Sequence, residues 1–200
     1  MLLLRLFSKK RDDMNIAVYC GSVFGNDISY ENSVKELAFE LYRRDINVVY
    51  GGSTQGLMGV ISQESMRLGN RVTGVIPYSL INKEIQSEGI TEVIKVNSMS
   101  ERKNKMEALS DAFIAMPGGY GTFDEIFEVL SAAQLGHHSK PCAFYNINGY
   151  YDKLIEFLHH SSKEGFINER FVEMIIISEH PKELLDKIEN YTPVKSKWEY

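Results

Sequence analysis

Three glycine-bearing turns are the part of this sequence best suited to chemistry. They lie at 20–22 (Cys-Gly-Ser), 51–56 (Gly-Gly-Ser-Thr-Gln-Gly) and 117–122 (Pro-Gly-Gly-Tyr-Gly-Thr, hereafter the glycine loop), and each follows a short run of β-branched or aromatic residues. Glycine lets the backbone approach a ligand closely, and the N–H groups of such a turn and of the helix after it attract anions. The turns therefore predict a binding edge for a phosphate group.

Other chemistries find little support in the sequence. It contains neither the G-x-G-x-x-G dinucleotide fingerprint nor a G-x-x-x-x-G-K-[ST] loop, which argues against a nicotinamide cofactor and against nucleoside triphosphate hydrolysis. The five histidines show no metal-ligand spacing, so we predict no metal site. Cys20 lacks an activating motif, and we expect it to be a small apolar residue at a strand end.

The charged residues beside the turns each allow two interpretations. Thr122 and Glu125 form a T-x-x-E pattern at the start of an amphipathic run, and spacing alone favours a capping box, in which the glutamate reaches back to the helix start, over a catalytic role. Arg102 and Lys103 follow a predicted strand. They are either solvated surface charges or a pair placed to neutralise a phosphate.

The elements that must position these residues predict the fold. From residue 15 onward, short apolar runs alternate with longer amphipathic runs, as in a parallel sheet with crossover helices. The predicted strands lie at 16–20, 46–50, 71–76, 92–96, 112–116, 142–145 and 174–177. The predicted helices lie at 30–43, 55–68, 98–109, 122–135, 151–164 and 181–191. We therefore expect an α/β, Rossmann-like, doubly wound parallel sheet of about seven strands with helices on both faces, whose ligands bind beyond the carboxyl ends of the strands.

Length and composition limit the class of protein. The 200 residues are 44% hydrophobic and 24% charged with a net charge of -5, which is typical of a globular protein and argues against binding to nucleic acid. We expect a disordered or mis-started extension at 1–13, with an apolar run too short for a signal peptide, and a single nucleotide-binding α/β domain at 14–200. No apolar run approaches the length of a membrane-spanning helix. With only two cysteines, the expected location is the cytoplasm.

One combination of motifs resembles a known family. The segment 117–125 (PGGYGTFDE) is similar to the P-G-G-x-G-T-x-x-E signature of the Lonely Guy family, cytokinin riboside 5'-monophosphate phosphoribohydrolases long labelled lysine decarboxylases. Other family landmarks follow in the same order: C-G-S at 20–22, G-G at 51–52, G-L-M-G at 56–59, G-V-I-P at 74–77, Met99 with R-K at 102–103, and A-Q-L-G at 133–136. The resemblance runs from about residue 15 to about residue 187. Lysine decarboxylation itself is disfavoured, because no lysine lies in a recognisable pyridoxal phosphate context.

The resemblance implies an activity and a set of site residues. The activity is hydrolysis of the N-glycosidic bond of an N6-modified adenosine 5'-monophosphate, or of AMP, to free base and ribose 5-phosphate without a cofactor or metal. The implied catalytic pair is Arg102 and Glu125, and the implied assembly is a homodimer with the site near its interface. The implied substrate contacts are Gly21, Ser22, Gly52, Glu84, Lys103, Gly118, Gly119, Tyr120, Gly121, Thr122, Asp124 and Ser131.

The chemistry of the bond agrees with those roles, and one alternative stays open. Breaking the bond leaves positive charge on the sugar, which a carboxylate at Glu125 would stabilise, and Arg102 would act as a fixed positive charge because arginine stays protonated. Asp124 stands where many relatives have glutamate, and Ser131 where threonine is common. The alternative is a protein that binds or senses a nucleotide without cleaving it, since the same glycine loops serve both functions. The pair Arg102 and Glu125 discriminates between them, because a binding protein needs no carboxylate at the anomeric carbon.

Overall fold

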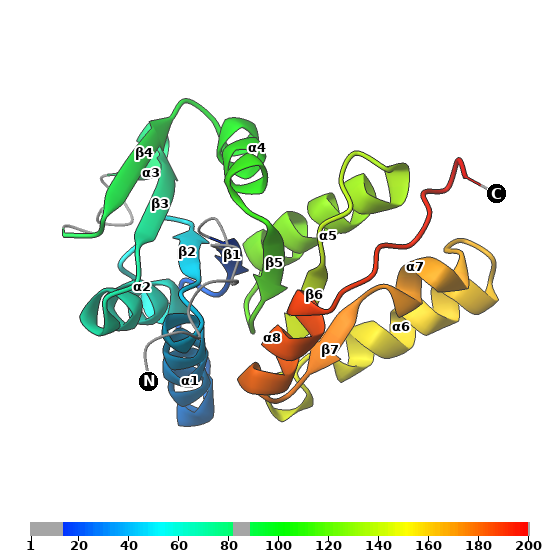
Figure 1. Ribbon diagram of the computed structural model, residues 1–200, viewed down its shortest axis with the longest axis horizontal. Helices are drawn as coiled ribbons and strands as arrows, with labels where there is room; N and C mark the ends of the chain where they lie inside the picture. The colour runs from blue at the N-terminus through cyan, green and yellow to red at the C-terminus, as the bar shows by residue number, and fades with distance from the viewer. Residues whose placement is uncertain (1–13, 82–88, 200) are drawn as a thin grey trace, which may run out of the picture.

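The computed structural model describes residues 14–81 and 89–199. The predicted extension at 1–13 and the candidate contact Glu84 lie outside this described part of the chain. Figure 1 shows the described residues as a twisted sheet flanked by helices.

Seven parallel strands form the sheet, and they confirm the predicted fold class. In chain order they are β1 (Asn15–Tyr19), β2 (Asn47–Tyr50), β3 (Val72–Pro77), β4 (Glu92–Val96), β5 (Ala112–Ala115), β6 (Cys142–Tyr145) and β7 (Ile176–Ser178). Their spatial order is β4-β3-β2-β1-β5-β6-β7. The chain therefore builds one half of the sheet outward from β1 and then returns to place β5 on the other side of β1. In doubly wound sheets, ligands bind at the carboxyl edge where the order reverses in this way.

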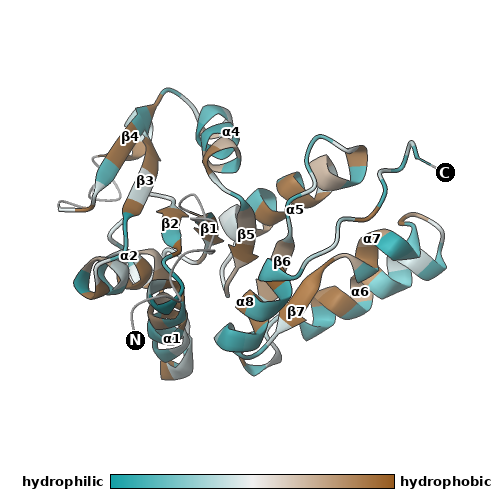
Figure 2. Cartoon of the chain, viewed as in Figure 1, coloured by the Kyte–Doolittle hydropathy of each residue, from teal (hydrophilic) through white to brown (hydrophobic). Residues whose placement is uncertain are grey.

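Helices cover both faces of the sheet because successive residues of the strands point to opposite sides. Ile16 and Val18 of β1 enter one core, whereas Ala17 and Tyr19 enter the other. The first core is covered by α1 (Ile28–Arg43), α2 (Gly56–Leu68) and α8 (Pro181–Glu189). The second is covered by α4 (Met99–Leu109), α5 (Tyr120–Leu135), α6 (Asp152–Lys163) and α7 (Glu169–Glu173). In Figure 2 the hydrophobic colour gathers in the strands and alternates with hydrophilic colour along the helices.

The ends of the elements agree with the sequence in most places. Gly69 and Gly136 end α2 and α5 in the left-handed conformation, with φ of 106° and 79°. The short helix α3 (Tyr78–Ile81), the 3₁₀ turn η1 (Ile147–Gly149) and α7 were not predicted. β7 begins at Ile176 rather than at residue 174, because Met174 is the C-cap of α7 and still has helical backbone angles, and periodicity alone does not separate helix from strand in such a run.

Candidate active site

The three glycine-bearing turns meet at the reversal between β1 and β5. The N–H of Gly21, after β1, donates to the carbonyl of Pro117, after β5, at 3.1 Å. The second turn also lies against the first, since a Cβ on Gly56 would lie 2.2 Å from the backbone nitrogen of Val23. This arrangement confirms the prediction that the turns share one edge of the sheet.

Helix α5 begins inside the glycine loop, and the capping-box interpretation of Thr122 and Glu125 is wrong. The N-cap of α5 is Gly119, which has no side chain to cap the helix. Thr122 is the third residue of the helix, and its hydroxyl lies against Gly118, where a Cβ would approach it to 2.1 Å. The free N–H groups of this helix start, not a threonine cap, therefore face the carboxyl edge of the sheet.

Glu125 instead forms a buried ion pair with Arg102. Nη1 of Arg102 lies 3.0 Å from Oε1 of Glu125, and the two side chains are only 7% and 8% exposed. The pair joins the second turn of α5 to the first turn of α4. Sequence spacing allowed Glu125 to be part of a helix cap and Arg102 to be a solvated surface charge. Only the fold brings the two residues into contact.

Arg102 is held in place by Val75 and Gly51, whose contacts with the arginine no sequence pattern predicted. Its Nε donates to the carbonyl of Val75 in β3 at 3.1 Å. Its Nη2 lies so close to Gly51 that a Cβ on this glycine would be 2.0 Å away. Any larger residue at position 51 would displace the guanidinium, so the second glycine turn makes room for the arginine. Gly52 beside it has a φ of 81°.

The ion pair lies in a low-dielectric part of the molecule. Cys20 and Tyr19, at the end of β1, are both buried near Glu125. Burial raises the pKa of the Cys20 thiol far above its ordinary value, and the charge of Glu125 adds to this shift. The thiol therefore stays protonated, in agreement with its predicted role as a small apolar residue. The guanidinium of Arg102 is the charge that balances the buried carboxylate.

A second pair of contacts connects the same two helices nearer the surface. Nζ of Lys103 lies 2.9 Å from Asp124 and 2.9 Å from Glu128. The hydrogen bond to Glu128, and then that to Asp124, raises the pKa of Lys103. Sequence analysis missed Glu128, although its position one helical turn after Asp124 could have indicated it. Two candidate residues, Lys103 and Asp124, are thus brought together beside the buried pair.

The tip of the glycine loop is open. A Cβ on Gly119 or Gly121 would meet no atom of the described residues within 4 Å, and the Tyr120 side chain is 93% exposed. Ser22, after β1, is also exposed. The loop thus presents exposed backbone at the edge where the buried pair lies.

Ser131 lies apart from the other candidate residues. It is six residues after Glu125 on α5, which places it about 9 Å along the helix and on another face. There it lines an apolar groove between α5, α6 and α7 together with Phe127, Leu130 and Phe171. Within one chain, therefore, the structure does not bring Ser131 to the Arg102–Glu125 pair.

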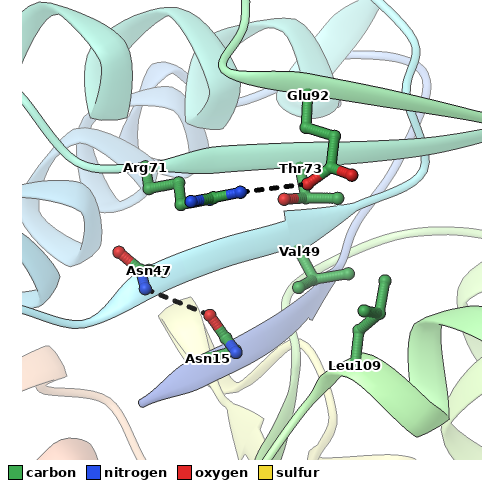
Figure 3. A pocket seen from close by; sticks show the side chains of 7 residues that line it. All are labelled: Asn15, Asn47, Val49, Arg71, Thr73, Glu92 and Leu109. Atoms are coloured by element: carbon green, nitrogen blue, oxygen red, sulfur yellow. Dashed lines mark hydrogen bonds and ion pairs between the residues drawn. The ribbon is translucent and has the colours of Figure 1, made fainter. Parts of the chain in front are cut away.

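A polar cavity of about 160 Å³ lies at the opposite, amino edge of the sheet (Figure 3). Its polar side chains bond to each other: Asn47 donates to Asn15 at 3.1 Å, and Arg71 pairs with Glu92 at 3.2 Å. None of the described candidate residues lines it. The cavity therefore does not compete with the carboxyl edge as the candidate active site.

Comparison with known proteins agrees with the motifs. The family model described as "Possible lysine decarboxylase" matches residues 58–188. A cytokinin riboside 5'-monophosphate phosphoribohydrolase of Arabidopsis thaliana is 47% identical over 178 residues, which cover 89% of this chain and 84% of that protein. A rice protein (Oryza sativa subsp. japonica) described as a probable enzyme of the same name is 44% identical over 190 residues, covering 92% of this chain and 78% of its own.

Solved structures share the fold at much lower identity. The molybdenum cofactor binding protein of the phototrophic bacterium Rippkaea orientalis superposes with a TM-score of 0.67 at 18% identity, over 90% of this chain and 98% of its own. This similarity shows the fold alone. Among residues 14–81 and 89–199, no helix is long and apolar enough to cross a bilayer, and no three His, Cys, Asp or Glu side chains gather in a way that could hold a metal ion.

Proposed function

Because the chain belongs to the family of cytokinin riboside 5'-monophosphate phosphoribohydrolases, we propose that it is a hydrolase that cleaves the N-glycosidic bond of an adenosine 5'-monophosphate. The substrate is AMP or a form with an isoprenoid group on N6, and the names of the relatives, which give a cytokinin riboside 5'-monophosphate as their substrate, support a nucleotide of this kind. The products are the free base and ribose 5-phosphate. One observation carries the proposal more than any other: a buried Arg102–Glu125 pair beside an open glycine loop.

Glu125 is proposed to act on the sugar. As the bond between the base and C1' of the ribose breaks, its electron pair leaves with the base and positive charge forms on the sugar ring. A buried carboxylate stabilises that charge strongly because little water screens it. The same carboxylate orients the water that adds to C1', and the proton that the water gives up balances the proton that the base takes.

Arg102 is proposed to keep this carboxylate ready for the reaction. A carboxylate buried without a partner favours its neutral, protonated form, and the adjacent guanidinium favours the ionised form. Arginine remains protonated in proteins, so its role is electrostatic rather than proton transfer. The carbonyl of Val75 and the space at Gly51 fix the guanidinium in the orientation that the pair requires.

The glycine loop is proposed to bind the 5'-phosphate. The free N–H groups at the start of α5, from Gly119 onward, and the positive end of the helix dipole attract an anion. Gly21, Ser22 and Gly52 are proposed to form the neighbouring part of the site. Lys103 is proposed to lie near the phosphate, and Asp124 is proposed to contact the ribose. Contacts from Glu84 and Ser131 also remain proposals.

Product analysis tests the function directly. We expect the purified protein to release free base and ribose 5-phosphate in equal amounts from isopentenyladenosine 5'-monophosphate or from AMP, as measured by chromatography. The substrate with the higher kcat/KM identifies the preferred base. If both nucleotides bind and neither is cleaved, the hydrolase proposal is wrong and the protein is a nucleotide-binding or sensing protein.

The assembly and location are also proposals. We propose a homodimer in the cytoplasm whose ligand is a small molecule rather than a nucleic acid. The family resemblance supports the dimer, and the net charge of -5 argues against a nucleic acid partner. Light scattering should give twice the mass of one chain, and a monomer at micromolar concentration would contradict the dimer.

A further inference from the structure

The backbone at the start of the glycine loop is held at three consecutive carbonyls. The carbonyl of Met116 accepts from the hydroxyl of Tyr151 at 2.6 Å, and that of Gly118 accepts from the hydroxyl of Tyr150 at 2.5 Å. Between them, the carbonyl of Pro117 accepts from the N–H of Gly21 at 3.1 Å. The two tyrosines come from the connection between β6 and α6, which the sequence motifs did not include in the site.

The bond from Tyr150 to the carbonyl of Gly118 determines where the N–H of Gly119 points. A trans peptide unit is planar, so its C=O and its N–H point in opposite directions. The carbonyl of Gly118 and the N–H of Gly119 belong to one such unit. The hydroxyl of Tyr150 holds that carbonyl on one side of the chain, so the N–H of Gly119 points to the other side.

The connection that carries the tyrosines is itself ordered by side-chain bonds. Asn146 accepts from the N–H of Tyr151 at 2.7 Å and donates to the carboxylate of Asp152 at 2.7 Å. Asn148, with a φ of 53°, donates to the hydroxyl of Ser29 at the start of α1. The segment that carries the two tyrosines is therefore held by its own hydrogen bonds, and it fixes the position of the two hydroxyls next to the glycine loop.

The two tyrosines differ in their surroundings. Tyr151 is 1% exposed and packs against Phe144 with ring centroids 4.6 Å apart. Burial raises its pKa far above the ordinary value, so its hydroxyl keeps the proton that it donates. Tyr150 is 39% exposed and packs edge-on against Tyr30 and Tyr151. Removing the hydroxyl of Tyr150 therefore leaves its packing intact, whereas any change at Tyr151 also affects the core.

We propose that Tyr150 and Tyr151 are positioning residues for the substrate phosphate: the hydroxyl of Tyr150 holds the carbonyl of Gly118 and so aims the N–H of Gly119 at the anion, and the hydroxyl of Tyr151 holds the carbonyl of Met116 and so fixes the backbone at the start of the loop. The inference rests on the proposed function, because it requires that the glycine loop binds the 5'-phosphate of the nucleotide. Preorganised donors bind an anion more tightly than mobile ones, because they lose less freedom on binding. Neither tyrosine needs to touch the substrate in this role.

The test is Tyr150→Phe, with Tyr42→Phe as the matched control. Tyr42 is a similarly exposed tyrosine in the last turn of α1, away from the carboxyl edge of the sheet. For Tyr150→Phe we expect KM for the nucleoside 5'-monophosphate, and the calorimetric Kd for inorganic phosphate, to rise about five- to tenfold, the loss of roughly one hydrogen bond. We expect kcat to change less than about twofold, and the melting temperature and the KM for the unphosphorylated nucleoside to stay unchanged.

Several results would overturn the inference. These are an unchanged KM for the monophosphate, an equal rise for the nucleoside and its monophosphate, or a wild-type protein that binds no phosphate. A failure of the proposed hydrolase activity is distinguishable, because phosphate binding by the wild type and by Tyr150→Phe is measured without turnover. Tyr151→Phe should also lower the affinity for phosphate, because it loosens the backbone at the start of the loop, and should lower the melting temperature as well.

Discussion

Glu125→Gln is expected to lower kcat for base release by about 10²- to 10³-fold or more, with little change in the affinity for the nucleotide. Glutamine has nearly the same shape and still accepts a hydrogen bond from Arg102, but it carries no negative charge to stabilise the sugar and cannot take a proton from water. The measurement is steady-state base release by chromatography, together with Kd for the nucleotide by calorimetry.

Glu156→Gln is the matched control for this prediction. Glu156 lies on α6 with its side chain 69% exposed, and its distance of 3.7 Å from Lys153 makes only a weak surface pair. Its kinetics should equal those of the wild type. Glu125→Gln with wild-type kcat would remove the carboxylate from the mechanism, and a large loss of affinity without a change in kcat would make Glu125 a binding residue only.

Arg102→Met is expected to abolish activity and to lower the free energy of unfolding by about 3–5 kcal/mol, because it leaves the Glu125 carboxylate buried without its partner. The double variant Arg102→Met/Glu125→Leu replaces both charges with apolar groups. It should recover at least half of the lost stability and none of the activity. Urea unfolding measures the first quantity, and base release measures the second.

A surface pair provides the contrast for Arg102. Arg67 pairs with Glu64 at 2.6 Å on α2, but its side chain is 66% exposed, so Arg67→Met should cost less than about 1 kcal/mol. Gly51→Ala should also lower the activity, as Arg102→Met does, because the added Cβ would displace the guanidinium of Arg102. If Arg102→Met were as stable as Arg67→Met, the Arg102–Glu125 pair would not be a buried pair in solution.

Much of the fold could be predicted because its signals are local. Strands buried on both faces read as short apolar runs, and Gly69 and Gly136 mark helix ends through the left-handed conformation that glycine adopts most easily. Short elements gave no such signal. The five residues of α7 and the four of α3 are too few to show a helical period.

The candidate site was harder to predict because its decisive contacts are not local. The T-x-x-E pattern at Thr122 predicts a cap, but Glu125 pairs with Arg102 because the reversal of strand order brings α4 beside α5. An S-x-x-E pattern at Ser98 does cap its helix: its hydroxyl accepts from the N–H of Glu101. The same spacing of a hydroxyl residue and a glutamate thus forms a cap at Ser98 but not at Thr122. The difference at Thr122 is the positive charge of Arg102, which comes from another helix and pairs with Glu125.

The pairing of β1 with β5 at the centre of the sheet also affects the order in which parts of the sheet form during folding. Asn15 at the start of β1 donates to Asp111, which is 96 residues further along the chain and directly precedes β5. Closing so long a loop is slow, and its entropy is lost before the contacts that compensate for it have formed. During synthesis the turns at Gly21 and Gly51 emerge well before Arg102 and Glu125. A growing chain therefore spends time with the first strands of its sheet made but without the Arg102–Glu125 pair. In a refolding experiment started by dilution from denaturant, the return of activity accordingly reports the formation of the whole sheet rather than of its first contacts.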